Sequence, residues 1–358
     1  MSKLRRARLI EQFEAKNIDA LLVTGPHNSR YLSGFTGSNS RTLIYANGDA
    51  VLFTDPRYTV QAKQQTDCRV VIVKGKPITL AVVKELGKKR PARLGFESDH
   101  TSFAQYEALK KTLPTRVELT PVSGLVEALR MVKDAGEIAL IRKAVTANSQ
   151  ALENALRRLK PGRMTEADFA AEIDAQNRKL GAEAPAFDTI VAAGKRSALP
   201  HAHPGRTVIG DGILLIDMGA FHDGYASDMT RTLHVGAAPA KFKKAYKAVL
   251  EAQLAAIDAV RPGATAVSID RAARKVLAGY GLDKQFVHST GHGLGLEIHE
   301  PPRLGGKDKT KLVPGMAITI EPGVYVEDWG GIRIEDTVLV TDTGVEILTP
   351  GSKELRTL

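Results

Sequence analysis

The sequence has one cysteine and no long apolar run. These two features argue against a disulfide-linked protein and against a membrane-spanning protein. The single cysteine, Cys68, cannot form an intrachain disulfide, which is typical of a protein kept in a reducing cytosol. The longest apolar runs, such as Ile213 to Ile216, contain four or five residues, whereas a membrane-spanning helix needs about 20. The basic N-terminus is interrupted by Glu11 and Glu14 and has no apolar core of signal-peptide length. We therefore expect a cytoplasmic protein that does not enter a membrane.

Acidic residues are in deficit, because the chain holds 50 Lys and Arg against 40 Asp and Glu, a net charge of +10. The excess is confined to the N-terminal third: residues 1–126 hold 20 cations and 11 acids, whereas residues 127–358 hold 30 and 29. The cations there are scattered, aromatic residues make up only 5% of the chain, and no nucleic-acid-binding motif is present. A solvated basic face is therefore favoured, and we expect no nucleic-acid partner.

The chain of 358 residues predicts two domains, because ordinary domains contain roughly 100–200 residues. In the N-terminal part, segments with helical spacing alternate with short β runs. Two of these runs, Arg41–Tyr45 and Ala50–Thr54, flank the turn sequence Asn-Gly-Asp, which is a strong signal of a β-hairpin. These patterns predict a three-layer α/β domain over residues 1–125 that begins with a helix over residues 3–17.

The remaining residues, 126–358, predict a second domain that contains an internal repeat. A helix is expected from about Leu125 to Leu159, where a Pro-Gly pair ends it. The segment 159–173 then resembles the segment 260–276, with a Pro-Gly pair, an Asp and an Ala-Ala pair at matching positions. Because β-rich stretches follow both segments, we expect an α+β domain built from two related halves, with a site between them.

Four acidic residues lie in or beside apolar β runs of this second domain: Asp217, Asp228, Glu321 and Glu335. A single acid of this kind is usually a solvent-facing strand residue. Four in one domain are hard to explain in that way, and a hairpin can bring Asp217 and Asp228 together, which would force one of them to protonate. Because a buried charge is costly unless it is paired or bound to a metal, the pattern indicates a cation site.

Three histidines, His288, His292 and His299, lie in a glycine-rich stretch of twelve residues. The two prolines that follow argue against the helix that a dinucleotide-binding fingerprint must open, and no Walker pattern is present. The glycines are better explained as freeing the backbone so that a ring nitrogen can reach the acids. Four carboxylates and one imidazole would balance two divalent cations. This oxygen-dominated set favours Mn²⁺, with Co²⁺ and Zn²⁺ as alternatives.

With these residues in view, the chain resembles the proline-specific branch of the pita-bread metallopeptidases, which includes aminopeptidase P and prolidase. The resemblance covers essentially the whole chain, through the segments GHGLGLEIHEPP, EPGVYV and GIRIED in the second domain and GFTGS and TDPRY in the first. It implies a creatinase-like N-terminal α/β domain followed by a pita-bread catalytic domain with pseudo-twofold αβ halves. It also implies that five side chains bind two metal ions: Asp217, Asp228, His292, Glu321 and Glu335.

The resemblance further implies hydrolysis of the bond between an N-terminal residue and a following proline, without a covalent intermediate. Glu321 would be both a metal ligand and a proton shuttle, and His299 would hydrogen-bond the developing oxyanion. His201 and His288 would also line the substrate side, and Arg333 would orient the substrate or a ligand carboxylate. A free substrate amine held near the metals would restrict cleavage to the first residue.

The resemblance leaves several alternatives open. The compact length and the GFTGS and TDPRY segments favour an Xaa-Pro aminopeptidase, and a prolidase, which cleaves only dipeptides, is the alternative. Creatinase lacks the metal ligands, and methionine aminopeptidase usually lacks this kind of N-terminal domain. A more remote alternative is a non-catalytic peptide- or protein-binding module, although such relatives have generally lost ligands. By analogy with relatives, we expect the N-terminal domain to mediate a homodimer.

Overall fold

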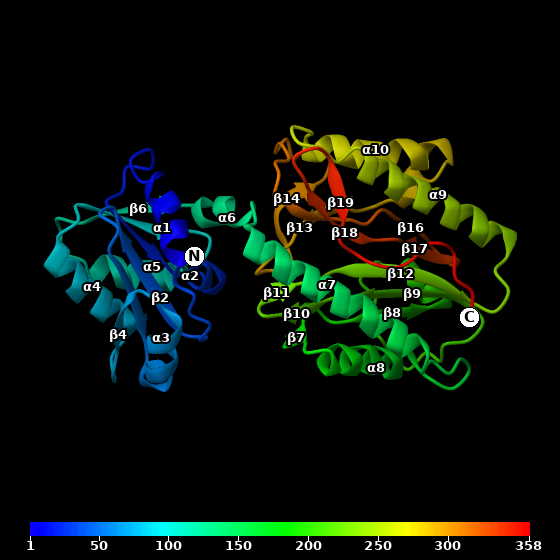
Figure 1. Ribbon diagram of the computed structural model, residues 1–358, viewed down its shortest axis with the longest axis horizontal. Coiled ribbons are helices and arrows are strands. Elements are labelled where there is room, and N and C mark those ends of the chain that lie inside the picture. The colour runs from blue at the N-terminus through cyan, green and yellow to red at the C-terminus, as the bar shows by residue number, and fades with distance from the viewer. The chain divides into compact units, whose positions relative to one another are not determined.

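A computed structural model describes the whole chain, Met1–Leu358, as two compact units, Met1–Arg130 and Met131–Leu358 (Figure 1). The division lies after Arg130, whereas the sequence predicted a boundary after residue 125. No helix of either unit combines the length and the apolar character that crossing a membrane requires.

The first unit is built on a six-stranded mixed sheet in the order β4-β3-β2-β1-β5-β6. β2 pairs antiparallel with both β1 and β3, and the other neighbours are parallel. The expected hairpin is confirmed, because Ile44 on β2 lies opposite Ala50 on β3. In sheet order, the strands are β4 (Arg69–Ile72), β3 (Ala50–Thr54), β2 (Ser40–Tyr45), β1 (Ala20–Val23), β5 (Arg93–Glu97) and β6 (Glu118–Val122).

Helices cover both faces of this sheet, as the three-layer prediction requires. Val51 and Phe53 of β3 belong to a core that includes Val82 of α4, whereas the intervening Leu52 packs with Ala62 of α3. This alternation follows from the two-residue period of a strand. The helices are α1 (Ser2–Ile10), α2 (Pro26–Ser33), α3 (Thr59–Gln65), α4 (Ile78–Lys89), α5 (Phe103–Thr112) and α6 (Leu125–Arg130), with one 3₁₀ turn, η1 (Pro56–Tyr58).

Two expected helix boundaries are wrong. α1 ends at Ile10 rather than near residue 17, and the chain then turns through Asn17, whose φ of 55° is left-handed, before it enters β1. The helix expected from Leu125 to Leu159 is two helices, α6 and α7 (Ala135–Leu156). Asp134 begins α7, because its side chain accepts a hydrogen bond from the third backbone N–H of that helix. Since α6 packs against α1 and α2, it belongs to the first unit.

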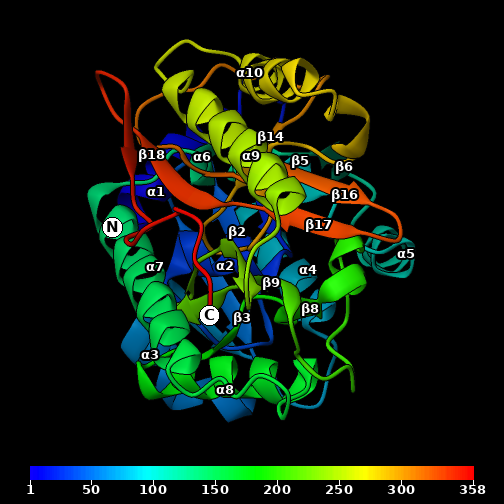
Figure 2. The ribbon, with the colours of Figure 1, turned by 90° about the vertical axis from the view of Figure 1, so that its right-hand side faces the viewer.

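The second unit consists of two halves with the same order of elements. In the first half, α7 and α8 precede a sheet in the order β12-β9-β8; in the second, α9 and α10 precede a sheet in the order β14-β13-β15-β18-β19. The two helix pairs lie on opposite sides of the strands (Figures 1 and 2). The predicted architecture of two related αβ halves is therefore confirmed. The remaining helices are α8 (Glu166–Lys179), α9 (Ala240–Asp258) and α10 (Ala266–Gly279), with 3₁₀ turns η2 (Gly194–Ala198) and η3 (Asp283–Gln285).

Short strands complete both halves. Two small sheets, β11-β10-β7 and the hairpin β16-β17, accompany the larger ones. The first half contains β7 (Ala184–Pro185), β8 (Ile190–Ala193), β9 (Gly212–Met218), β10 (Ala220–His222), β11 (Tyr225–Ala226) and β12 (Met229–Val235). The second half contains β13 (Gly291–Gly293), β14 (Glu300–Leu304), β15 (Ala317–Ile320), β16 (Gly323–Val326), β17 (Gly330–Arg333), β18 (Asp336–Val340) and β19 (Val345–Ile347).

The Pro-Gly repeat makes the same backbone hydrogen bond in both halves. The N–H of Gly162 donates to the carbonyl oxygen of Ile209 at 2.7 Å, and the N–H of Gly263 donates to that of Leu312 at 2.8 Å. Each Pro-Gly turn is followed by a helix of 14 residues, α8 or α10. The weak sequence match therefore reflects a repeated supersecondary unit.

A buried ion pair links Lys133, near the first residue of the second unit, to Glu300 on β14. Lys133 Nζ lies 3.1 Å from Glu300 Oε2, and the two side chains are 1% and 3% exposed. The backbone N–H of Lys133 also donates to the carbonyl oxygen of Gly315 at 2.9 Å. Glu300 accepts a further hydrogen bond from the N–H of Glu297 at 3.1 Å, so its carboxylate closes the turn that precedes β14.

Replacing Lys133 with Met is expected to lower the free energy of unfolding of the second unit by about 3–5 kcal/mol, because Glu300 would stay buried without its counter-charge. The double variant Lys133→Met/Glu300→Met is expected to recover most of this loss. Calorimetric unfolding measures both. Lys143→Met is the matched control, because the Lys143–Asp223 pair is exposed and such pairs contribute about 0–1 kcal/mol. A loss no larger than that of the control would contradict the assignment.

Candidate metal centre

The four predicted acids and the predicted histidine line one cavity of the second unit, with a volume of about 720 Å³. The acids come from strand ends in both halves. Asp217 lies on β9 and Asp228 just before β12, while Glu321 follows β15 and Glu335 precedes β18; His292 lies on β13. The other residues that the sequence assigned to the site line the same cavity: His201, His288, His299 and Arg333.

The donor atoms lie close enough to share a cation. His292 Nε2 is 3.5 Å from both Asp228 Oδ2 and Glu321 Oε1. Donor atoms of Asp228, His292 and Glu335 all lie within 4.8 Å of one another. His292 Nδ1 donates to the carbonyl oxygen of Gly293 at 3.0 Å, which leaves the lone pair of Nε2 directed at the acids. A backbone contact of this kind fixes the tautomer of a metal-binding histidine.

Burial and mutual repulsion raise the pKa of three of these carboxyls. The pKa of Asp228 lies well above its usual range, because the group is desolvated and lies near the charges of Asp217 and Glu321. Desolvation and the neighbouring Asp228 likewise raise the pKa of Glu335. Desolvation also raises the pKa of Glu321, although His292 opposes it. Cations among these groups would remove the repulsion and keep the carboxylates ionised.

Two carboxylates each have one oxygen held by the protein and one without a partner. Arg333 Nη2 donates to Asp217 Oδ2 at 2.6 Å, and Thr230 Oγ1 donates to Glu335 Oε2 at 2.7 Å. The second oxygens, Asp217 Oδ1 and Glu335 Oε1, are buried and accept no hydrogen bond. Unpaired buried oxygens beside an available imidazole fit a metal site, because buried carboxylates must be paired or coordinated.

Arg333 belongs to a chain of hydrogen bonds that includes a residue the sequence analysis did not single out, Tyr325 on β16. Arg333 Nη1 donates to the Tyr325 hydroxyl at 2.6 Å, and the hydroxyl donates to His288 Nε2 at 2.9 Å. His288 Nδ1 in turn donates to the carbonyl oxygen of Ser289 at 2.8 Å. Burial is the main cause that lowers the pKa of His288 to about 4, so the ring is neutral at physiological pH.

His299 and Arg303 bring further polar groups to the cavity. The rings of His299 and His292 pack edge to face with their centroids 4.4 Å apart, and burial lowers the pKa of His299. The sequence analysis overlooked Arg303 on β14, whose Nε donates to Ser289 Oγ at 3.4 Å and whose guanidinium forms no ion pair. Its position four residues after His299 is the one signal that could have drawn attention to it.

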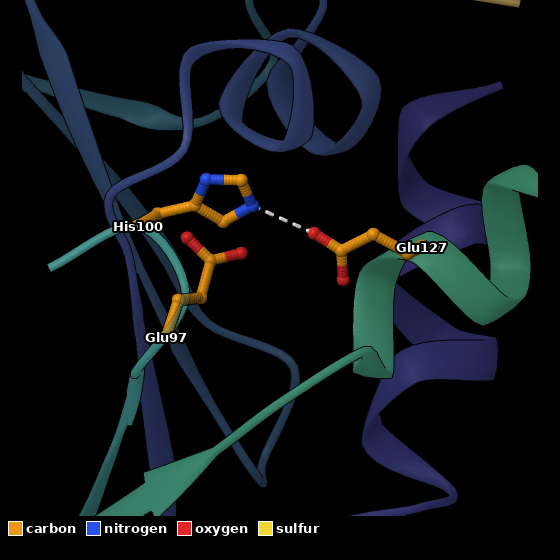
Figure 3. A group of neighbouring side chains, drawn as sticks. All are labelled: Glu97, His100 and Glu127. Atoms are coloured by element: carbon orange, nitrogen blue, oxygen red, sulfur yellow. Dashed lines mark hydrogen bonds and ion pairs between the residues drawn. The ribbon is translucent and has the colours of Figure 1, made fainter. Parts of the chain in front are cut away.

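A second group of possible ligands, Glu97, His100 and Glu127 in the first unit, is explained by hydrogen bonding (Figure 3). The backbone N–H groups of Thr24 and Gly25 donate to Glu97 Oε2 at 2.6 and 2.7 Å. His100 Nε2 lies 2.8 Å from Glu127 Oε1. The carboxyl group of Glu97 therefore accepts at the N-terminus of α2, and these hydrogen bonds oppose the burial that raises its pKa.

Two family descriptions match the chain. Residues 5–132 match the creatinase/prolidase N-terminal domain, and residues 139–342 match metallopeptidase family M24. The two matches meet close to the division between the structural units after Arg130.

Proteins similar over their full length carry related names. An Xaa-Pro dipeptidase from Bacillus anthracis is 39% identical, with a TM-score of 0.96 and 100% of both chains covered. An X-Pro aminopeptidase from Thermotoga maritima is 36% identical, with a TM-score of 0.91 and coverage of 97% of this chain and 100% of that one. An Xaa-Pro dipeptidase from Pyrococcus furiosus is 37% identical, with 99% of each chain covered.

In metal-free protein, thermal stability is expected to fall as the pH rises from 5 to 8, and Glu335→Gln is expected to flatten this dependence. Folding raises the pKa of Glu335 above its unfolded value of 4.5, so the folded state binds the proton more tightly and loses stability as that proton leaves. Unfolding midpoints in chelator measure the effect.

Addition of Mn²⁺ to the parent protein is expected to raise the midpoint and flatten the same profile, because a ligand that binds only the native state stabilises it. Glu335→Gln should lose most of this metal-induced rise. Glu327→Gln, at an exposed position of the β16–β17 turn, is the control. Identical pH profiles for the parent and Glu335→Gln would contradict the placement of a buried, repelled carboxylate.

Proposed function

This chain belongs to metallopeptidase family M24, and we propose that it removes the N-terminal residue from peptides whose second residue is proline. The observation that carries the proposal is the arrangement of four carboxylates and His292 around one cavity, with a free buried oxygen on both Asp217 and Glu335. The similar proteins from Bacillus anthracis and Thermotoga maritima are named for cleavage next to proline, which supports the same specificity here.

The family depends on a pair of metal ions, and we propose that five side chains of this chain hold them: Asp217, Asp228, His292, Glu321 and Glu335. When bound, such cations polarise a carbonyl group and lower the pKa of a water molecule, so that the water can act as a nucleophile at neutral pH. The oxygen-dominated donor set favours Mn²⁺, with Co²⁺ and Zn²⁺ as alternatives. The family resemblance implies a homodimer, and the single cysteine is in keeping with a reducing cytoplasm.

In the proposed reaction Glu321 carries the proton. Thr319 Oγ1 donates to Glu321 Oε1 at 3.3 Å, which orients the carboxylate beside His292. From this position Glu321 can take a proton from the attacking water and deliver it to the proline nitrogen as the peptide bond breaks. His299, which is neutral because burial lowers its pKa, has one ring N–H to donate to the developing oxyanion.

The cavity also suits the proline ring. Phe187, Ile190 and Pro301 contribute apolar surface to it, against which a rigid pyrrolidine ring can pack. Proline nitrogen carries no N–H in a peptide, so this part of the cavity requires no acceptor. His201 and His288 lie along the same walls. Both nitrogens of His288 are already hydrogen-bonded, and we therefore propose that His288 contacts the substrate through its ring.

A specific observation favours the alternative, an Xaa-Pro dipeptidase. Arg303 lines the cavity without an acidic partner. Its charge is therefore available to the C-terminal carboxylate of the proline residue in an Xaa-Pro dipeptide. The relatives from Bacillus anthracis and Pyrococcus furiosus are both named Xaa-Pro dipeptidases. A non-catalytic binding module is the more remote alternative, and the complete donor set weighs against it.

The metal-loaded protein is expected to release alanine from Ala-Pro and Ala-Pro-Ala and to spare Ala-Ala-Ala, because the cavity favours a proline ring in the second position. Mass spectrometry of the products, after chelator treatment and reloading with Mn²⁺, measures this. Cleavage of Ala-Pro alone would make the protein a dipeptidase. Failure to cleave any of the three peptides, with two metal ions bound per chain, would overturn the peptidase proposal.

Glu321→Gln is expected to lower kcat by about 10²–10⁴-fold, because the amide cannot carry the proton. Elemental analysis of the same sample separates loss of the proton carrier from loss of metal. Glu327→Gln serves again as the matched Glu-to-Gln control, since Glu327 does not line the cavity. Normal turnover by a metal-loaded Glu321→Gln variant would contradict the assigned role.

A further inference from the structure

Two of the candidate metal ligands, Asp228 and Glu335, belong to different halves of the second unit, and an arginine joins the two segments that carry them. The backbone N–H of Glu335 donates to the carbonyl oxygen of Thr230 on β12 at 3.1 Å. The Arg231 guanidinium donates to the carbonyl oxygens of Thr230 at 3.0 Å and Glu335 at 2.5 Å. Arg231 therefore ties the backbone that follows Asp228 to the backbone of Glu335.

Arg231 is itself held by Asp336, the residue directly after Glu335. Arg231 Nη2 donates to Asp336 Oδ1 at 2.9 Å, and the two side chains are 9% and 1% exposed. Neither residue lines the cavity that holds the candidate ligands. Arg231 instead lines a separate hollow of about 320 Å³. The pair is therefore placed to act on the metal centre through the ligands beside it, and not by contact with metal or substrate.

The second oxygen of Asp336 is held by α9 and by the C-terminal segment. Lys353 Nζ lies 2.5 Å from Asp336 Oδ2, and Gln253 Nε2 donates to the same oxygen at 2.9 Å. Lys353 Nζ also donates to Gln253 Oε1 at 3.0 Å. Both oxygens of Asp336 are thus occupied by protein donors, in contrast to the free oxygens of Asp217 and Glu335. Asp336 is therefore not a metal ligand, although it neighbours one.

The C-terminal segment that carries Lys353 is fixed to the same strand as Arg231. The hydroxyl of Tyr246 donates to the carbonyl oxygen of Lys353 at 2.9 Å. Further along, the N–H of His234 on β12 donates to the carbonyl oxygen of Arg356 at 3.1 Å, and the N–H of Leu358 donates to that of His234 at 3.0 Å. These bonds hold the segment along β12, so that Lys353 is presented to Asp336.

We propose that Lys353 and Asp336 are positioning residues of the candidate metal centre. Asp336 orients the Arg231 guanidinium, and Lys353 restrains Asp336. Through Arg231 this network sets the separation of Asp228 and Glu335. The last residues of the chain therefore take part in holding the metal pair. This inference rests on the proposed metal centre and adds to it residues that contact neither metal nor substrate.

Lys353→Met is expected to weaken the binding of the second, more weakly held Mn²⁺ ion by about 10–100-fold, the range for loss of a partner behind a metal ligand. Calorimetric titration of the chelator-treated full chain with Mn²⁺ measures this. Asp336 keeps Arg231 as its counter-charge, so the variant should fold. Lys353→Arg keeps the cation and should restore most of the affinity. At two Mn²⁺ per chain, the electron paramagnetic resonance spectrum of Lys353→Met should show isolated ions where the parent protein shows a coupled pair.

Gln253→Met is a second, independent variant, because it removes the donor that α9 supplies to the same oxygen of Asp336. It should weaken Mn²⁺ binding in the same direction by a smaller factor. Lys143→Met is the matched control, since Lys143 forms an exposed pair with Asp223. Mn²⁺ binding equal to that of the parent in both Lys353→Met and Gln253→Met would overturn the positioning role, and so would an equal loss in Lys143→Met.

If the parent protein binds no Mn²⁺, the proposed metal centre fails, and unfolding free energies measured in chelator then decide the network. The effects of Lys353→Met and Glu335→Gln should be non-additive in a double-mutant cycle, because one hydrogen-bonded network joins the two residues. The cycle of Lys353→Met with Glu327→Gln is the control and should be additive, since Glu327 is exposed. Additive effects in both cycles would show that Lys353 does not act on Glu335.

Discussion

Asp228 and Glu335 are buried side by side, and burial is the main cause that makes both difficult to ionise. The charge of Asp228 adds to this effect at Glu335, and the charges of Asp217 and Glu321 add to it at Asp228. Much of the surrounding structure serves to hold these like charges apart and oriented. Thr230 occupies one oxygen of Glu335, and Arg333 occupies one oxygen of Asp217. Buried charges without such partners would be too costly to keep. The remaining free oxygens therefore point where divalent cations can balance them, which is the physical basis of the candidate metal centre.

The two halves contribute to this centre in equivalent ways. In each half one acid lies at the end of the sheet's central strand, Asp217 on β9 of the three-stranded sheet and Glu321 after β15 of the five-stranded sheet. Another acid precedes a strand paired with that central strand, Asp228 before β12 and Glu335 before β18. The equivalence ends at the third strand. β13 carries His292, whereas the corresponding β8 reads Ile-Val-Ala-Ala and offers no ligand. The added histidine, and the arginine that follows on β14, come from the second half.

Local patterns predicted much of the fold and most of the candidate site. The Asn-Gly-Asp hairpin, the Pro-Gly repeat and acids in apolar β runs each leave a signal within a few neighbouring residues. The structure contains the first two features, whereas of the four acids only Asp217 lies inside a strand and the other three lie directly beside strand ends. The break between α6 and α7 was missed although Asp134 and Glu137 have the capping-box spacing that begins a helix, and only packing shows that α6 belongs to the first unit. Tyr325 and Arg303 were missed for another reason. Their importance lies in partners brought close by folding, His288 for Tyr325 and Ser289 for Arg303.

The pairing of Lys133 with Glu300 joins positions 167 residues apart in the chain. Each charge is tolerated in the interior only while the other is present. A protein in which only one of the two residues has been replaced is therefore expected to fold poorly. Related proteins should therefore either keep both residues or have replaced both. The two positions are expected to vary together across the family, and an apolar pair is the replacement that the buried setting accepts most readily.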